Sequence, residues 1–193
     1  AVVKSDHAAM LRALYDARPC EREASASHIP LLIQGSPELD FQAGVTCQRP
    51  VGLEDLMPTL LDLTSVEIPD GVDGVSLVPV LRGEEREIRP YLHGEHAPCY
   101  SQAQAYHFLT DGRMKYIWRP VDGSEQLFDL ADDPQERVDL AAQEDHAPEL
   151  AQWRSRLIDE LRNRPEGFVA DGALVAGRAY KAVLPHLASQ SAA

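Results

Sequence analysis

The sequence is short of cysteine and of long apolar runs, and each shortage excludes a class of protein. Its three cysteines (Cys20, Cys47 and Cys99) are too widely spaced for a disulfide framework or for a structural zinc site built on cysteine pairs. The longest apolar runs, such as residues 29–33, are far too short to span a bilayer. We therefore expect a protein of a reducing cytoplasm, unless a preceding segment carries an export signal.

Positive charge is also scarce. Lysine and arginine together number 18 against 31 aspartates and glutamates, which gives a net charge of −13. An acidic surface repels phosphate backbones and anionic lipids, so nucleic acid and membrane are not the expected partners. The hydrophobic fraction of 44% in 193 residues is that of an ordinary globular protein, with one domain or one domain and part of another.

Over the first 83 residues, short apolar runs alternate with segments of helical periodicity. Residues 1–5 and 30–34 are apolar on both faces, as strands buried between two layers are. Such strands alternating with helices predict a parallel sheet covered by helices. We therefore assign residues 1–83 to an α/β domain, with helices expected over residues 8–15, 53–63 and 76–81.

The helix expected over residues 53–63 contains a proline. Pro58 lacks a backbone N–H and its ring clashes with the preceding turn, so it is tolerated only near the start of a helix. The helix must therefore begin near Asp55, which would place Pro58 in its first turn.

Beyond residue 84 the pattern changes to short strands joined by turns. The expected strands lie over residues 91–93, 105–110, 113–118 and 126–130. Asp111-Gly112 is a strong hairpin signal, and residues 147–163 carry apolar side chains at helical spacing. We therefore expect residues 84–193 to form a subdomain with a four-stranded antiparallel sheet, a packed helix and a tail without clear periodicity. In this packing, Trp153, Leu157 and Leu161 would contact Leu109, Ile117 and Phe128.

Asp6 and His7 are the first candidate site residues. They directly follow a predicted strand, which is where α/β sheets place binding sites. A carboxylate oxygen and an imidazole nitrogen could supply half the shell of a divalent cation. Asp is also a favoured helix N-cap, so a purely structural interpretation of Asp6 stays open.

A second candidate cluster is the stretch His93-Gly94-Glu95-His96. On an extended strand, His93 and Glu95 share one face and His96 points to the other, so the three converge only if Gly94 bends the chain. We interpret this stretch as the polar end of a surface strand. Four further histidines are isolated in the sequence and are expected to be structural or solvated (His28, His107, His146 and His186).

The acidic run over residues 129–139 resembles a calcium loop only in composition. It lacks the central glycine and terminal glutamate of an EF-hand, and a turn at Asp133-Pro134 explains it better. The sequence also contains no glycine-rich phosphate loop, no G-x-S-x-G and no H-E-x-x-H motif. The residues by themselves thus indicate an acidic α/β chain with one candidate metal-binding site, at Asp6 and His7.

Five stretches in a fixed order carry a family resemblance. They are VVKSDH at 2–7, HIPLLI at 28–33, DLMPTLLDL at 55–63, GVDGVSL at 71–77, and the set KYI, EQLFDL, DPQE and DL between 115 and 140. Together they resemble the C-terminal part of the sulfatase family, arylsulfatase-like enzymes of the alkaline-phosphatase-like superfamily. The expected fold is therefore the end of that α/β sandwich, followed by a small antiparallel sheet and helix.

This resemblance implies a hydrolase of small-molecule sulfate esters or, in close relatives, of phosphonate or phosphate esters. In the family, a formylglycine made from Cys or Ser in a Cys/Ser-x-Pro-x-Arg motif is the nucleophile, held by a divalent cation for which calcium is expected. The sequence lacks that motif, so it carries no catalytic residue. Only Asp6 and His7 carry over, as the second pair of metal ligands.

Two family features near this pair are absent. Ala8 follows His7, where the family has a glycine. No lysine lies at the position of the family's sulfate-binding lysine, and the nearest positively charged residues are Arg18 and Arg22. Substrate-binding residues and the oligomeric state stay unassigned. We expect the chain alone to be inactive. The alternative is a non-catalytic sulfatase-fold remnant that serves as a scaffold or interaction module.

Overall fold

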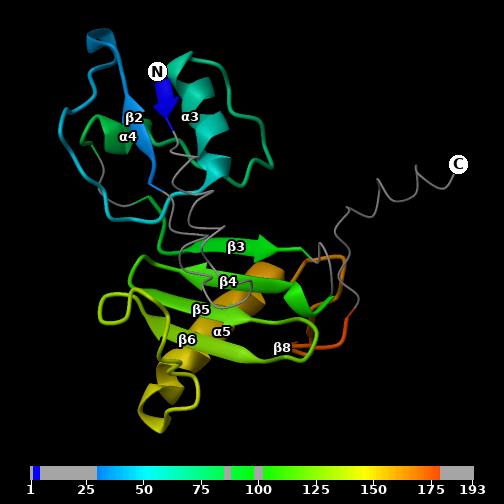
Figure 1. Cartoon of the computed structure of the whole chain (residues 1–193). Helices are drawn as coiled ribbons and strands as arrows, with labels where there is room; N and C mark the ends of the chain where they lie inside the picture. Colours follow the sequence, from blue (N-terminus) through cyan, green and yellow to red (C-terminus); the bar gives the residue numbers. More distant parts are fainter. Residues whose placement is uncertain (1, 5–29, 85–87, 98–101, 179–193) are drawn as a thin grey trace, which may run out of the picture. The chain divides into compact units, whose positions relative to one another are not determined.

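The computed structural model describes residues 2–4, 30–84, 88–97 and 102–178 (Figure 1). The chain divides into two compact units. The first contains residues 1–92 with 134–136, and the second contains residues 93–133 and 137–193. Among the described residues, no helix is long and apolar enough to cross a membrane.

The first unit contains a two-stranded sheet, in which β1 (Val2–Lys4) pairs with β2 (Leu32–Gln34). The strands run antiparallel, with Val2 opposite Gln34, and Leu32 is 67% exposed. The prediction that these two strands belong to a parallel sheet is therefore wrong, and so is the predicted burial of β2 on both faces. A strand that is apolar on both faces is buried only where a layer covers each face, and the described residues place none over Leu32.

The other regular elements described in this unit are short and helical. They are the 3-10 turns η1 (Pro37–Leu39) and η2 (Leu53–Asp55) and the helices α3 (Leu56–Leu63) and α4 (Val78–Leu81). Asp55 is the N-cap of α3, so Pro58 lies in the first turn, and the predicted start is confirmed. The helix expected over residues 8–15 lies outside the described residues.

The side chain of Asp55 is fully buried and joins three segments of the first unit. Its Oδ2 accepts a hydrogen bond from the Gly52 N–H at 2.8 Å, and its Oδ1 accepts one from the Val75 N–H at 2.9 Å. The guanidinium of Arg89, itself only 12% exposed, forms an ion pair with the same carboxylate. A buried charge is tolerated only when it is paired and hydrogen-bonded in this way.

Thr59 and Gly74 reinforce the same junction. The Thr59 hydroxyl donates to the Asp55 carbonyl oxygen at 2.6 Å and accepts from the Leu77 N–H at 2.9 Å. A Cβ atom at Gly74 would overlap the backbone of Glu54, so only glycine lets the two segments approach this closely. The residues of the 55–63 and 71–77 stretches are thus explained by contacts with each other.

Replacing Asp55 by Ala should destabilise the first unit by about 3–5 kcal/mol, because Arg89 would lose its buried partner. Amide hydrogen exchange of α3, measured by mass spectrometry, should then accelerate at least about 100-fold. Asp62→Ala is the matched control, since Asp62 lies on the same helix and makes an exposed hydrogen bond to Ser76. Equal exchange in the two variants would contradict the role assigned to Asp55.

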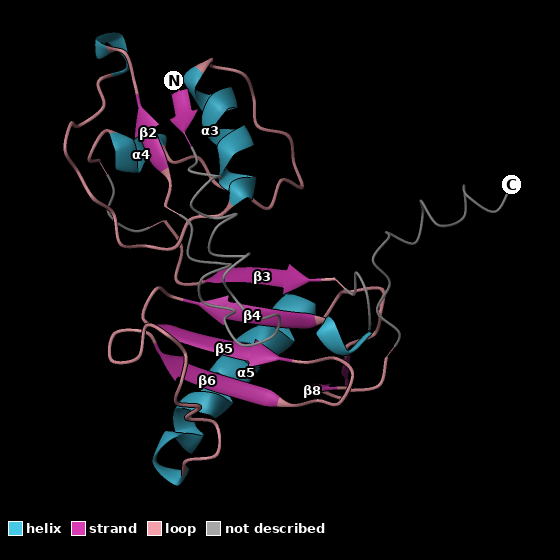
Figure 2. Cartoon of the chain, viewed as in Figure 1, coloured by secondary structure: helices cyan, strands magenta, loops and turns pink. Residues whose placement is uncertain are grey.

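The second unit is built on a four-stranded sheet in the order β3-β4-β5-β6 (Figure 2). Its strands are β3 (Leu92–His96), β4 (Tyr106–Thr110), β5 (Met114–Trp118) and β6 (Glu125–Asp129). The turns η3 (Gln102–Gln104) and η4 (Glu144–His146) precede β4 and the helix α5 (Ala147–Leu161), which crosses one face of the sheet. The predicted antiparallel sheet and packed helix are confirmed.

The strand register identifies the face that α5 covers. Arg154 of α5 donates two hydrogen bonds to the Glu125 carboxylate, both at 2.6 Å. Glu125 pairs with Trp118 across β5 and β6, and partners that face each other share one side of the sheet. Leu109, Tyr116 and Leu127 lie in register on that same side, which is therefore the face under α5.

Trp153, Leu157 and Leu161 of α5 are fully buried, as predicted. Two of their predicted partners are wrong, however. Ile117 is opposite Phe108 and Phe128 is opposite Lys115, so both lie on the other side of the sheet from Leu109. Side chains alternate with a period of two along a strand, so the covered partners in β5 and β6 are the neighbouring residues, Tyr116 and Leu127.

The tail was expected to lack clear periodicity, but it contains a hairpin. Strands β7 (Val169–Ala170) and β8 (Ala173–Leu174) pair around Asp171 and Gly172, whose φ angles are 50° and 74°. Two consecutive positive φ angles are typical of the turn that an Asp-Gly pair favours. The Asp171-Gly172 pair was therefore a hairpin signal in the sequence. The two strands that it joins are too short to show a hydrophobic pattern.

Trp153→Ala should lower the free energy of unfolding of the second unit by about 3–5 kcal/mol, because it leaves a cavity between α5 and the sheet. Urea unfolding followed by the fluorescence of Trp118, which is buried in β5, measures the change. Gln152→Ala, at the neighbouring exposed position of the helix, should leave the transition within about 0.5 kcal/mol of the parent. Indistinguishable midpoints for the two variants would refute the packing of α5.

Candidate functional site

The predicted metal pair, Asp6 and His7, lies outside the described residues, as do Arg18 and Arg22. Strand β1 ends at Lys4, two residues before Asp6. The assignment of this pair as metal ligands therefore stays a prediction from the sequence. The titratable residues described below come from the second unit.

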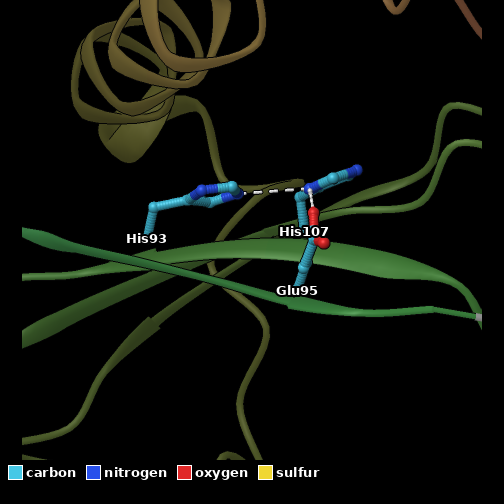
Figure 3. A group of neighbouring side chains, drawn as sticks. All are labelled: His93, Glu95 and His107. Atoms are coloured by element: carbon cyan, nitrogen blue, oxygen red, sulfur yellow. Dashed lines mark hydrogen bonds and ion pairs between the residues drawn. The ribbon is translucent and has the colours of Figure 1, made fainter. Parts of the chain in front are cut away.

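Three side chains from two adjacent strands meet in the second unit (Figure 3). His93 and Glu95 come from β3 and His107 from β4, and one donor atom of each lies within 4.8 Å of the other two. The distance from His93 Nε2 to His107 Nδ1 is 3.2 Å, and that from His107 Nδ1 to Glu95 Oε2 is 3.6 Å. We call these three residues the His93 cluster.

Strand alternation explains how the His93 cluster forms. His93 and Glu95 point to one side of β3, and His96 stacks on Tyr106, with ring centroids 5.3 Å apart. Tyr106 precedes His107 on β4 and therefore points to the other face. The predicted separation of His96 from His93 and Glu95 is confirmed. Gly94 has a packing role, because a Cβ atom there would overlap the ring of Phe108.

His107 was expected to be isolated, and that expectation is wrong. It supplies the third group of the cluster from 14 residues further along the chain. The signal in the sequence was weak, because it required both the β3–β4 pairing and the phase of each strand to be known. The interpretation of residues 93–96 as merely the polar end of a surface strand is accordingly incomplete.

The imidazole of His107 is fully buried among aromatic rings. Trp118 stacks against it at a centroid distance of 6.0 Å, and Phe168 meets it edge-on at 5.2 Å. Burial, with smaller contributions from His93 and Arg164, lowers the pKa of His107 to about 3. The ring is therefore neutral at pH 7, and its contact with Glu95 is not an ion pair under those conditions.

An ion pair holds Glu95 in place. The Arg164 Nη2 lies 3.0 Å from Glu95 Oε2 and 3.0 Å from Glu166 Oε1, and its Nε donates to Glu166 Oε2 at 3.2 Å. One guanidinium thus serves two carboxylates, which leaves the group with one net negative charge. Such an arrangement can hold a proton between the two rings or attract a cation.

The acidic run over residues 129–139 is confirmed as turn structure. Asp133 Oδ2 accepts the N–H groups of Arg137 at 2.5 Å and of Val138 at 2.7 Å. Asp139 Oδ1 accepts those of Leu127 at 3.1 Å and of Ala141 at 2.9 Å. These carboxylates satisfy the backbone of the turn that follows β6.

The fold and the ordered stretches define the C-terminal region of a sulfatase. Residues 12–164 match the family described as "N-sulphoglucosamine sulphohydrolase, C-terminal", and the chain belongs to that family. The predicted family resemblance and fold class are thereby confirmed.

Named relatives agree with this membership. The chain is 36% identical over 125 residues to an arylsulfatase of Clostridium perfringens, and the aligned region covers 65% of this chain and 25% of that protein. It is 31% identical over 154 residues to human arylsulfatase K, with 75% of this chain and 27% of that protein aligned. A solved putative sulfatase of Bacteroides thetaiotaomicron superposes with a TM-score of 0.54 at 31% identity, covering 59% and 25%. The chain thus spans about a quarter of the length of its relatives.

The low pKa of His107 should make stability depend on pH. The unfolded chain takes up this proton near pH 6.5, whereas the folded chain takes it up only near pH 3, so acidification favours unfolding across that window. Between pH 7 and pH 5 His107 should account for a loss of about 2 kcal/mol. Urea unfolding at both pH values in a chelator, for the parent and for His107→Phe, measures this. Identical losses in the two chains would contradict the shifted pKa.

Proposed function

We propose that this chain is the C-terminal part of a hydrolase of sulfate esters and that its natural substrates are sulfated sugars. The observation that carries the proposal is the family match over residues 12–164. The sugar is favoured by a second relative, the Δ4,5-hexuronate-2-O-sulfatase of Bacteroides thetaiotaomicron, 33% identical over 116 residues and covering 59% of the chain. The solved structure of a 2-O GAG sulfatase, at 32% identity and a TM-score of 0.54, supports the same class of substrate.

In this proposal the chain supplies the metal ligands Asp6 and His7, and the rest of the parent protein supplies the nucleophile. The donor chemistry of the pair fits a divalent cation in part. The carboxylate suits calcium, whereas the imidazole must be accompanied by oxygen ligands from elsewhere. When bound, such a cation neutralises the charge of the sulfate group and lowers the pKa of the nucleophile.

The chain alone should therefore not hydrolyse sulfate esters. Removing a nucleophile costs several orders of magnitude in rate, and the sequence carries none of the expected motif. The purified 193-residue chain should show no turnover of 4-nitrophenyl sulfate or of a 2-O-sulfated disaccharide. Turnover by this chain that disappears in Asp6→Ala would contradict the proposal.

The complementary experiment uses the parent reading frame. A Cys/Ser-x-Pro-x-Arg motif preceding residue 1, expressed together with this chain, should give turnover that falls at least about 1,000-fold in Asp6→Ala. Asp145→Asn, at an exposed carboxylate of η4, is the matched control and should retain full activity. A frame without that motif, or an intact parent without turnover, would favour the alternative of a non-catalytic remnant.

A further inference from the structure

We propose that His93, Glu95 and His107 form a binding site for a transition-metal cation of the zinc type, with neither Asp6 nor His7 among its ligands. The inference rests on the described residues of the second unit alone. It does not depend on the proposed sulfatase activity. The site would use three protein ligands and leave one coordination position open to water.

Two of the three donor separations in the His93 cluster are close to the edge of a tetrahedron around zinc, and the third is below 4.8 Å. A zinc ion bound to nitrogen or oxygen at 2.0–2.1 Å separates neighbouring ligands by about 3.3 Å. The two donor separations, 3.2 Å from His93 Nε2 to His107 Nδ1 and 3.6 Å from His107 Nδ1 to Glu95 Oε2, lie on either side of that value. Figure 3 shows the Glu95 carboxylate and the His93 ring both directed at the same ring nitrogen of His107.

The donor set selects the kind of metal. Two imidazole nitrogens and one carboxylate oxygen suit zinc and its neighbours, whereas calcium and magnesium prefer shells made of oxygen.

The surroundings supply the outer contacts that metal ligands usually have. Arg164 forms an ion pair with the Glu95 carboxylate, and its own charge is offset by Glu166, so it orients Glu95 at little electrostatic cost to a bound cation. Trp118 and Phe168 fix the ring of His107 by stacking and edge contacts. Glu95 is 37% exposed, so this one of the three proposed ligands is in contact with solvent.

The competing interpretation is a hydrogen-bonded pair of imidazoles with no ligand. The two can be separated with the full chain, purified without an affinity tag and stripped with a chelator. Cobalt is the probe, because its tetrahedral complexes absorb visible light far more strongly than its aqueous ion does. Bound zinc is then counted by elemental analysis after equilibrium dialysis.

We expect one equivalent of zinc per chain and a tetrahedral cobalt spectrum without sulfur-to-cobalt bands. Glu95→Gln and His93→Gln should each weaken zinc binding more than about 100-fold, since changes to outer-shell partners alone cost 10–100-fold. His96→Gln is the matched control: it changes a histidine of the same strand that points to the other face, and it should bind zinc like the parent. Added zinc should also raise the unfolding midpoint of the parent and of this control only.

Absence of zinc binding in the parent at micromolar concentrations would overturn the proposal. So would binding that Glu95→Gln and His93→Gln leave unchanged, or binding that His96→Gln abolishes. Calcium binding lost in Asp6→Asn would report the other pair, so failure here is distinguishable from failure of the proposed function. Circular dichroism of each variant excludes loss of fold as the cause of lost binding.

Discussion

A single buried carboxylate, that of Asp55, is the contact on which the first unit depends. It joins the turn before α3, the segment around Val75 and the Arg89 side chain, none of which forms a regular sheet with another. The described residues of this unit contain little regular structure. Side-chain hydrogen bonds and an ion pair therefore join segments that backbone hydrogen bonds between strands would join in a larger sheet. The free-energy cost of removing the Asp55 carboxylate from water is offset, because both of its oxygens accept hydrogen bonds and its charge is paired with Arg89.

This role gives a physical meaning to the stretches that carry the family resemblance. Asp55, Pro58 and Thr59 begin a helix and anchor it, and Gly74 allows the neighbouring segment to approach. None of these residues does chemistry. Their contacts account for the family stretches in structural terms, and the proposed metal ligands Asp6 and His7 lie outside the described residues.

The second unit is governed by strand register. Alternation places Leu109, Tyr116 and Leu127 under α5 and fixes the helix through Arg154 and Glu125. The same alternation brings the His93 cluster together at the β3–β4 side of the sheet. The two proposed cation sites of the chain therefore differ in their ligands. Asp6 and His7 would need further oxygen ligands from elsewhere. The His93 cluster would supply two nitrogen ligands and one oxygen ligand, and a water molecule would complete its four-coordinate shell.

Local patterns in the sequence determined the strands of the second unit, α5, the start of α3 at Asp55 and the family, because periodicity, proline geometry and motif order are properties of neighbouring residues. The separation of His93 and Glu95 from His96 was also predictable, since it follows from the period of a single strand. Only the tertiary structure decided the antiparallel pairing of β1 with β2, the partners of Trp153 and the place of His107. Each of these depends on which strands pair and in what phase, and a shift of one residue sends every side chain to the opposite face.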